Sequence, residues 1–543
     1  MSAASATAAD ESRDAPSRPL LTVVVPVYNG GEEIVQNIGA IRRAVSEGLR
    51  GEEIEVIVVS DGSLDDTGER LLAARSDTGI RVIHYDRNLG KGYAVKAGAL
   101  ASHGKWVALV DSDLDLDPAS VPTYLEIARR ERLDFAIGSK RHPESIVHYP
   151  RSRRIASWCY QQLNRVFFRL DVRDTQVGLK VFSRGVVEEV LPLLLVKRFA
   201  FDLELLAVAK SLGYGRVREL PVRLDYRFTG SGVRSLAVLL ALWDTAAIFY
   251  RLRVLRTYQR KRRLVGHAQR PEQWPLVSVI GDHSAASGLD YVHIELASSA
   301  EEAQGELLAV FRPGARPAGN WLSAAAPFFA EPDVAAVIAP TLAPLRAPLR
   351  ERVAAAVLES RLGVGSRRSS FFPGNVREVV DHPAENLVVR RAEYLAARAD
   401  GAAAEELVAW FAARGQRTIY TPDTSVAAVP APLVRAHLAG VFRHGRARGH
   451  AARQTGGRST SGATALSLAP AAAAILGVAF LLAGGALRDV GLALVLAYAA
   501  ALAASGIHAA LRFRSLAVAI LEPPAVVASQ AFYLAGFVRG LTD

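Results

Sequence analysis

The chain has 543 residues, a formal net charge of +11 at pH 7 and one cysteine. This length predicts two or three domains rather than one, and a single cysteine excludes a disulfide framework or a zinc site built from cysteines. The positive charge suits nucleic acid, an anionic membrane surface or phosphate-bearing substrates as partners.

Residues 1–19 are polar, rich in alanine and serine, and contain no apolar run, so we expect a disordered arm rather than a signal peptide. From residue 20 to residue 232, apolar runs alternate with amphipathic helical patterns. Strands are expected at 21–25, 55–59, 81–84, 106–110 and 135–138, and helices at 33–46 and 93–102. Apolar strands separated by helices predict an α/β domain with a mostly parallel sheet covered on both faces.

Four polar segments follow these strands, where ligands of parallel sheets usually bind. They are Pro26-Val-Tyr-Asn29, Ser60-Asp-Gly-Ser63, 86–92 and 111–115. In the last segment three aspartates alternate, and alternate residues of an extended chain share one face. Three adjacent carboxylates repel one another unless a hard divalent cation lies between them. This predicts a metal site formed by Asp111, Asp113 and Asp115; an acidic turn after a strand is the alternative.

Residues 233–255 are apolar and aromatic, but charges interrupt them, so we expect an interfacial helix followed by a basic linker to residue 270. A second α/β region is expected at 271–453. Two long apolar segments, 463–487 and 490–511, can each cross a bilayer. A third, 516–538, is interrupted by Glu522-Pro-Pro524 and is expected to be a kinked span or a re-entrant hairpin. The domain 463–540 thus holds two or three spans, or, as the alternative, a soluble helical hairpin.

Positive charge indicates which side of the membrane each part occupies. The basic run that ends at Arg458 precedes the first apolar segment, and Arg512 and Arg514 separate the second from the third. We therefore expect a multi-pass membrane protein whose N-terminal region is cytoplasmic. Because the basic runs 251–263 and 435–458 lie beside apolar segments, membrane phosphates are favoured as partners over nucleic acid.

Four motifs in this order resemble the family 2 glycosyltransferases of the GT-A fold, a Rossmann-like mixed sheet. They are Val24-Val-Pro-Val-Tyr-Asn29, Val58-Val-Ser-Asp-Gly-Ser63, Asn88-Leu-Gly-Lys-Gly92 and Asp111-Ser-Asp113. Downstream, Arg173-Asp-Thr-Gln-Val-Gly-Leu-Lys180 and Phe201-Asp-Leu-Glu204 resemble the polyprenyl-phosphate branch, which includes dolichyl-phosphate glucosyltransferases and dolichol-phosphate mannose synthases. The resemblance covers residues 19–263.

The resemblance implies roles for individual residues. Donor contacts would come from Pro26, Tyr28, Asp61, Lys91, Asp111 and Asp113, and Mg²⁺ or Mn²⁺ would lie on Asp111, Asp113 and Asp115. The acceptor phosphate would meet Ser139, Lys140, Arg153, Arg154 and Ser157. Arg227 would close on the donor, while Asp174, Asp202 and Glu204 match acidic positions near the sugar or acceptor. Asp202 and Glu204 share a face only if their segment is extended.

The second region resembles the same family more weakly, so the fold is expected to be duplicated. Pro275-Leu-Val-Ser-Val-Ile280 resembles the family's first strand, but Arg312, Pro313 and Gly314 stand where its carboxylates belong. We interpret it as a degenerate, non-catalytic copy, with ordinary α/β packing as the alternative. Its role could be scaffolding, binding of a protein partner or orientation on the membrane.

The leading hypothesis is an inverting, metal-dependent hexosyltransferase that uses a nucleoside-diphosphate sugar and a polyprenyl phosphate, with glucose or mannose favoured. One alternative is a family 2 transferase that acts on a hydroxyl of a membrane glycolipid or polysaccharide, which would need a general base. The other is a non-catalytic sugar-binding scaffold. The intact aspartates of the first domain argue against this alternative.

Overall fold

The chain forms two compact units in a computed structural model. Unit 1 comprises 1–84 and 88–270, and unit 2 comprises 85–87 and 271–543. The structure describes residues 18–147, 151–197, 200–224, 235–265, 274–281, 286, 288–364, 368, 370–380, 382, 384, 386–454 and 462–543.

Unit 1 contains a seven-stranded sheet with the order β3-β2-β1-β4-β7-β5-β8. Its strands are β1 (Leu21–Val27), β2 (Ile54–Asp61), β3 (Arg81–Tyr85), β4 (Trp106–Leu109), β5 (Phe135–Ser139), β7 (Lys180–Ser183) and β8 (Val217–Pro221). A small separate pair consists of β6 (Ile146–Val147) and β9 (Arg223–Leu224). β1 is parallel to β2 and β4, and β5 is parallel to β8, whereas β7 is antiparallel to both β4 and β5. The sheet is therefore mixed and mostly parallel.

Helices cover both faces of this sheet because alternate strand residues point to opposite sides. Val23 and Val25 of β1 belong to the core formed with α1 and α4. On the other face α3 lies so close that a Cβ on Gly98 would be 2.6 Å from Val24. The helices are α1 (Ile34–Gly48), α2 (Thr67–Thr78), α3 (Lys91–Ala101), α4 (Val121–Arg130), α5 (Arg151–Phe168), α6 (Arg184–Glu189), α7 (Phe201–Ser211), α8 (Ser235–Phe249) and α9 (Thr257–Val265).

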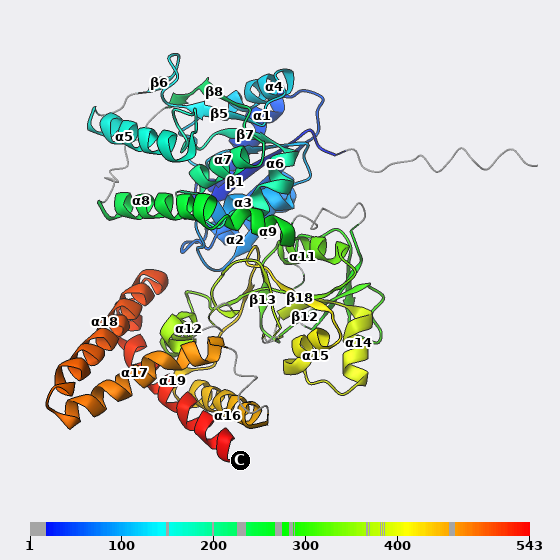
Figure 1. Cartoon of the computed structure of the whole chain (residues 1–543). Coiled ribbons are helices and arrows are strands. Elements are labelled where there is room, and N and C mark those ends of the chain that lie inside the picture. The colour runs from blue at the N-terminus through cyan, green and yellow to red at the C-terminus, as the bar shows by residue number, and fades with distance from the viewer. Residues whose placement is uncertain are drawn as a thin grey trace, which may run out of the picture. The chain divides into compact units, whose positions relative to one another are not determined.

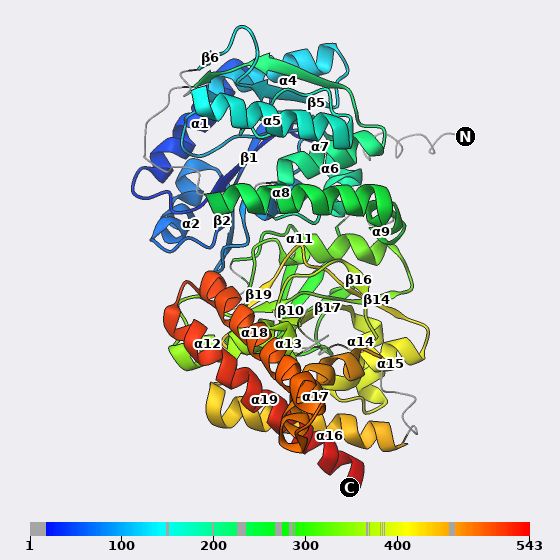
Figure 2. The same ribbon diagram turned by 60° about the vertical axis from the view of Figure 1, so that its left-hand side comes forward.

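The helix α8 is the segment expected at the membrane interface. It packs beside α5, where the hydroxyl groups of Tyr160 and Thr245 are 2.9 Å apart and the rings of Phe167 and Phe249 are 5.0 Å apart; Figure 2 shows both helices running across unit 1. Trp243 of α8 and Tyr250 after it remain exposed. An apolar, aromatic helix that keeps such side chains exposed is compatible with contact to lipid.

The predicted strands agree with the structure to within two residues at each end. One difference is that the first strand, expected at 21–25, continues through Pro26, which lies inside β1 opposite Val59. A second is β7, whose antiparallel position between β4 and β5 follows no pattern that the sequence displays.

Unit 2 contains a second seven-stranded sheet with the order β11-β10-β12-β17-β14-β18-β16. Its strands are β10 (Val277–Ile280), β11 (Ile294–Ala297), β12 (Leu307–Phe311), β14 (Val334–Ile338), β16 (Arg377–Glu378), β17 (Asn386–Arg390) and β18 (Arg417–Tyr420). Three short strands form a further sheet: β13 (Arg316–Pro317), β15 (Thr341–Leu342) and β19 (Val426–Ala427). Its helices before the C-terminal group are α11 (Trp321–Ala325), α12 (Leu349–Glu359), α13 (Arg361–Val364), α14 (Arg391–Ala399) and α15 (Leu407–Ala413).

Six consecutive strands have the same arrangement in both sheets. The series β2-β1-β4-β7-β5-β8 corresponds to β11-β10-β12-β17-β14-β18, and each neighbouring pair has the same relative direction. Because Val24 pairs with Leu109 and Ile280 with Val310, Arg312 occupies the position that Asp111 occupies in unit 1.

A hydrogen-bond motif also recurs at the other end of these strands. In unit 1 the hydroxyl of Thr22 contacts Glu55 and accepts from the Gly104 N–H at 2.9 Å. In unit 2 the hydroxyl of Ser278 contacts Glu295, and the Gly305 N–H donates to it at 2.8 Å. The two sheets therefore share local side-chain chemistry as well as strand order.

Four helices end the chain: α16 (Leu438–Gln454), α17 (Gly462–Ala483), α18 (Leu487–Phe513) and α19 (Leu516–Thr542). Figure 1 shows α17 and α18 as a hairpin that projects from unit 2. Among the described residues, α18 and α19 are long and apolar enough to cross a membrane, and the described part of α17, Ala469–Ala483, is a shorter apolar helix. The apolar segments expected at 463–487, 490–511 and 516–538 thus correspond to three helices.

Candidate active site

Two loops at the carboxyl ends of β1 and β2 are joined by hydrogen bonds. The Gly30 N–H donates to Thr67 Oγ1 at 2.9 Å, and the Leu64 N–H donates to Asn29 Oδ1 at 2.8 Å. Asn29 has a φ of 51°, in the left-handed region that asparagine tolerates better than most residues. Pro26 and Tyr28, predicted donor contacts, lie half-buried at the start of this paired region.

The carboxylate of Asp61 holds the loop that precedes α3. Asp61 is buried, and its two oxygens accept from the Leu89 N–H at 2.7 Å and from the Gly90 N–H at 2.9 Å. The Asn88 side-chain amide also donates to it at 2.9 Å. Asp61 thereby fixes the turn that places Lys91 at the first position of α3.

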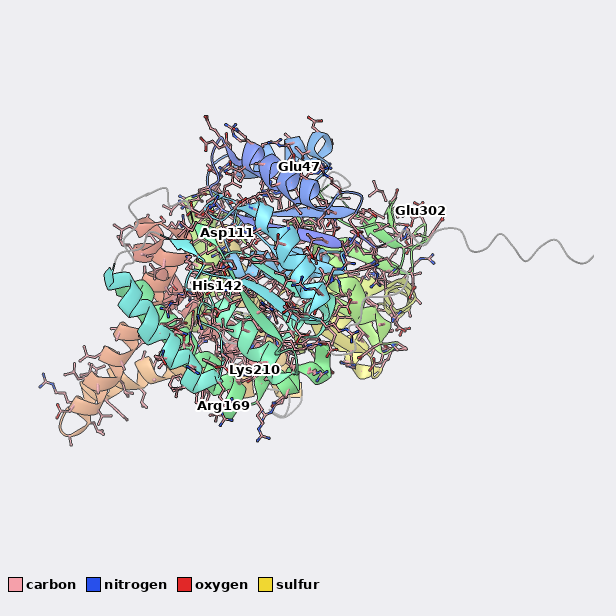
Figure 3. The ribbon with its side chains drawn as sticks, turned by 90° about the horizontal axis from the view of Figure 1, so that it is seen from above. Glu47, Asp111, His142, Arg169, Lys210 and Glu302 are labelled. Carbon is pink, nitrogen blue, oxygen red and sulfur yellow. The ribbon has the colours of Figure 1, made fainter. Side chains whose placement is uncertain are left out.

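Lys91 and Asp111 form the central ion pair of the site. Lys91 Nζ lies 2.5 Å from Asp111 Oδ1, and the two side chains are 36% and 27% exposed. Desolvation by itself would lower the pKa of Lys91, but the carboxylates of Asp111, Asp202 and Asp113 raise it above its ordinary value. The ammonium group therefore stays charged beside the acidic loop that follows β4. Figure 3 labels Asp111 in this loop.

Gly178 fixes the position of the Asp111 side chain. A Cβ on Gly178 would lie 1.9 Å from Asp111 Oδ2 and 2.4 Å from its Cγ, far inside contact distance. Only glycine fits against this carboxylate. Steric contact with Asp111 therefore explains why a glycine ends the run Asp174-Thr-Gln-Val-Gly178. The sequence alone did not identify this residue as part of the site.

The three aspartates do not line one face of an extended strand as predicted. β4 ends at Leu109, the chain turns, and Leu114 adopts a φ of 59°. Asp113 Oδ1 accepts from the Asp115 N–H at 3.2 Å, so these two residues form a local turn. Within the described part of the chain, no group of three acidic, histidine or cysteine side chains is arranged to hold a metal. The expected extended arrangement is therefore corrected to a turn, and the assignment of the three aspartates as metal ligands stays a prediction.

Asp174 connects the site to the segment predicted to bind the acceptor phosphate. Its Oδ2 accepts from the Lys140 N–H at 3.2 Å, and its own N–H donates to Glu219 at 2.9 Å. Ser139 is fully buried at the end of β5. The other predicted acceptor contacts, Arg153, Arg154 and Ser157, lie in α5 and are not described at the side-chain level. Arg227, predicted to close on the donor, lies outside the described residues.

A buried ion pair that the sequence analysis missed lies beneath the site. Lys180 in β7 is fully buried, and its Nζ is 2.7 Å from Asp202 Oδ1 in the first turn of α7. A buried ammonium requires such a partner because an unpaired charge is costly away from water. The two motifs that suggested the polyprenyl-phosphate branch are thus joined by one contact. An isolated lysine in an apolar strand was the only available signal.

Glu204 does not reach the site. Residues 201–211 form a helix, so Glu204 diverges from Asp202, and its side chain is fully buried. One oxygen accepts from the N–H groups of Leu195 and Val196 at 2.9 and 2.8 Å, and the other accepts from the Tyr258 hydroxyl. Burial raises the pKa of Glu204. These contacts support a structural role for Glu204, and its predicted catalytic role stays a prediction.

The family model for glycosyl transferase family 2 matches residues 22–191. A dolichyl-phosphate beta-glucosyltransferase of Trichomonas vaginalis is 30% identical over 241 residues, which is 41% of this chain and 70% of that protein. The glycosyltransferase AglD of Haloferax volcanii is 34% identical over 204 residues, 37% of this chain and only 32% of AglD. The undecaprenyl-phosphate mannosyltransferase of Micrococcus luteus is 27% identical over 242 residues, 42% of this chain and 96% of that protein.

Among solved structures, the glucosyl-3-phosphoglycerate synthase of Mycobacterium tuberculosis in complex with uridine diphosphate aligns with a TM-score of 0.33 and 18% identity. The alignment covers 43% of this chain and 79% of that structure. The motifs at Asp61, Lys91 and Asp111 lie inside the segment matched by the family model. The chain belongs to glycosyltransferase family 2.

Proposed function

We propose that the protein transfers a hexose from a nucleoside-diphosphate sugar to a polyprenyl phosphate at the membrane. The observation that carries this proposal is Asp111, held by Gly178 and paired with Lys91, at the sheet edge where the Asp61-bound loop ends. Further support comes from relatives whose names specify transfer to dolichyl phosphate or undecaprenyl phosphate.

The donor would occupy the edge formed by the loops after β1, β2 and β4. Asp61 would contribute mainly by fixing the turn at residues 88–90. We also propose that it contacts the base of the nucleotide. Pro26 and Tyr28 would line the nucleotide. Lys91 would approach the diphosphate, since it lies at the N-terminus of α3, where the helix dipole also favours an anion.

Mg²⁺ or Mn²⁺ fits the oxygen donors at this edge. Asp111 and Asp113 would hold it, with the remaining positions taken by diphosphate oxygens and water, as is usual for these hard cations. Bound there, the cation would neutralise charge on the departing nucleoside diphosphate. Asp115 is better assigned to the turn, since its N–H donates to Asp113.

The acceptor would need positioning more than it needs a base. A phosphate monoester has its second pKa near about 6, so its oxygen is already anionic at neutral pH. That oxygen would attack C1 of the sugar, and the C1–O bond to the nucleoside diphosphate would break with its electron pair leaving on the diphosphate. Asp174, through the Lys140 N–H, would hold the acceptor segment, and Lys140, Arg153, Arg154 and Ser157 would supply the contacts.

Transfer to a sugar hydroxyl, the alternative within this family, would require a general base. The two acidic side chains of α7 are already engaged, Glu204 with backbone N–H groups and Asp202 with Lys180. This arrangement favours the phosphate acceptor.

The direct experiment incubates the full-length protein in membranes with a panel of nucleotide sugars, Mn²⁺ or Mg²⁺ and a short polyprenyl phosphate. Mass spectrometry should detect a polyprenyl-phosphate hexose. Hexose attached only to saccharide hydroxyls would instead indicate the alternative, and no transfer at all would support a sugar-binding scaffold.

We further propose that the sheet of unit 2 is a diverged copy of the sheet of unit 1 and does not catalyse transfer. The shared order of six strands and the Thr22 and Ser278 motifs support common ancestry. Arg312, Pro313 and Gly314 follow β12 where the acidic motif follows β4, and a cation would be repelled by Arg312 there. A role in binding a protein partner or the membrane is compatible with this.

Membrane association is supported by two helices with the length and composition of spans, and we propose a multi-pass arrangement with unit 1 on the cytoplasmic side. The arginines before α17 and after α18 support that orientation.

A further inference from the structure

The helix α19 has the length and hydropathy of a membrane span, but two of its neighbours, α12 and α16, carry charged side chains. Its N-terminal half packs against α12 and α18, in a core that includes Val357, Phe513 and Val526. The Gln530 side chain donates to the Leu362 carbonyl of α13 at 2.8 Å. Since α12 and α13 carry Glu359 and Arg361, a spanning α19 would draw these charges into the hydrocarbon, where they are expensive.

The C-terminal half of α19 packs against α16 through interlocking glycines. A Cβ on Gly445 or Gly449 would lie 2.3 or 2.1 Å from a backbone carbonyl of α19. A Cβ on Gly536 or Gly540 would lie 2.2 or 2.0 Å from a carbonyl of α16. Gly445 meets Tyr533 and Gly449 meets Phe537, so the two helices run in the same direction. Small residues at this spacing let helix backbones touch, which fixes the pair as one rigid element.

The two helices of the pair expose different side chains. On α16, Arg443, Arg446, His450 and Arg453 follow one another at helical spacing and are exposed, and Arg446 also pairs with Asp543. On α19 the exposed apolar residues Leu516, Ile520, Val527, Val538 and Leu541 also recur at helical spacing. A basic helix beside an exposed apolar stripe is the pattern of helices that lie in an anionic membrane surface.

The ends of α19 give an independent argument about topology. α19 begins two residues after α18 ends, and it ends where Asp543 pairs with Arg446 of α16 at 2.5 Å. α17 and α18 form an antiparallel hairpin, because Gly477 packs against Gly491 and Leu494 around the tight connection at Gly484 and Gly485. The beginning of α17 and the end of α18 therefore share one membrane face.

The segment between α16 and α17, Thr455 to Ser461, is polar and cannot cross a bilayer. The end of α16 must therefore lie on the same face as the beginning of α17. Because Asp543 lies beside α16, both ends of α19 are on that face. A helix whose two ends lie on one side has not crossed.

We propose that α19 lies on the membrane face occupied by unit 2, and that the α16–α19 pair binds anionic lipid headgroups there. Only α17 and α18 would then enter the bilayer, and the C-terminus would lie on the same side as the sheet of unit 2. This inference concerns the placement of the chain and does not depend on which sugar or acceptor is used.

The first test places one cysteine at a time in a full-length Cys159→Ser background. A cysteine added after Asp543 reports the C-terminus, and Gly485→Cys reports the tip of the hairpin. In sealed vesicles of either orientation, a membrane-impermeant maleimide should label the C-terminus and the tip from opposite sides of the membrane. Labelling of both positions from the same side would overturn the proposal.

The second test measures depth in reconstituted vesicles of phosphatidylglycerol and phosphatidylcholine. A fluorophore on Val527→Cys, at the middle of α19, should be quenched more by lipids with a spin label near the headgroup than by lipids with one near the chain end. A spanning helix would give the reverse order and refute the proposal. The same label should lose its shallow quenching in the Arg443→Glu/Arg453→Glu variant but not in Arg50→Glu, an exposed arginine of unit 1. Equal quenching in all three proteins would refute the lipid-headgroup contact.

Discussion

Replacing Gly178 with alanine should distinguish the effect of displacing Asp111 on kcat from an effect on the stability of the fold. The added Cβ would lie 1.9 Å from Asp111 Oδ2, so the carboxylate has to move by about 1.5 Å to regain an ordinary contact distance. Misplacing a catalytic group by about 1 Å can cost on the order of 100-fold in rate. We therefore expect kcat to fall about 100-fold in Gly178→Ala.

Gly178→Ala should affect the stability of the fold less than it affects kcat. Inserting a methyl group into packed surroundings typically costs about 1–3 kcal/mol, but Asp111 is partly exposed and can turn towards solvent. We expect the lower end of that range and a well-folded protein at 25 °C. Thermal unfolding in detergent and single-turnover transfer to polyprenyl phosphate measure the two effects.

Gly98→Ala is the matched control. Its Cβ would press on Val24 and Val59 at 2.6 and 2.9 Å, which crowds the core but contacts no carboxylate. It should lower the melting temperature at least as much as Gly178→Ala while kcat stays within about threefold. The reasoning would be refuted if Gly178→Ala kept its wild-type kcat, or if both variants lost activity in proportion to stability.

Three further predictions address other parts of the chain. Glu204→Gln should lower the free energy of unfolding by about 1–3 kcal/mol because it weakens buried hydrogen bonds, while kcat changes less than about threefold; a selective loss of kcat would restore a catalytic role. Burial would raise the pKa of Glu55, but His103 and Arg81 lower it from 4.5 to about 2. Its contribution of about 3 kcal/mol should therefore be complete above pH 4.5 and be lost as the pH falls towards 2, and a Glu55→Gln variant with an unchanged acid-unfolding midpoint would contradict this. Arg312→Ala should leave the transfer rate within about twofold, since unit 2 is proposed not to catalyse; a large loss measured in the same assay would show that unit 2 takes part in the reaction.

Much of unit 1 could be predicted because apolar runs and the residues that end them are local signals. β1, β2 and β4 were identified from apolar runs, and the loops carrying Asp61 and Asp111 follow from strand direction. The geometry of the acidic loop could not be predicted, since it depends on the left-handed conformation of Leu114, a residue type that rarely adopts it.

The remaining features depend on contacts between distant residues. Lys180 and Asp202 form a buried ion pair, and Gly178 packs against Asp111, yet neither contact has a periodic signature. By hydropathy α19 is also a candidate span. Our proposal that it does not cross the bilayer rests on its packing against α12 and α16. A helix is assigned to lipid or to protein by its neighbours, which composition does not specify.

The central claim is that Asp111 is essential for transfer of a hexose to a lipid phosphate. The most direct measurement is the initial rate at which wild type and Asp111→Asn form polyprenyl-phosphate hexose from a nucleotide sugar and Mn²⁺, with the product identified by mass spectrometry. The account predicts a lipid-phosphate product from wild type and a rate at least about 100-fold lower for Asp111→Asn, because the variant loses a carboxylate that would hold the cation stabilising the leaving diphosphate. An Asp111→Asn protein that forms the same product at the wild-type rate would contradict it.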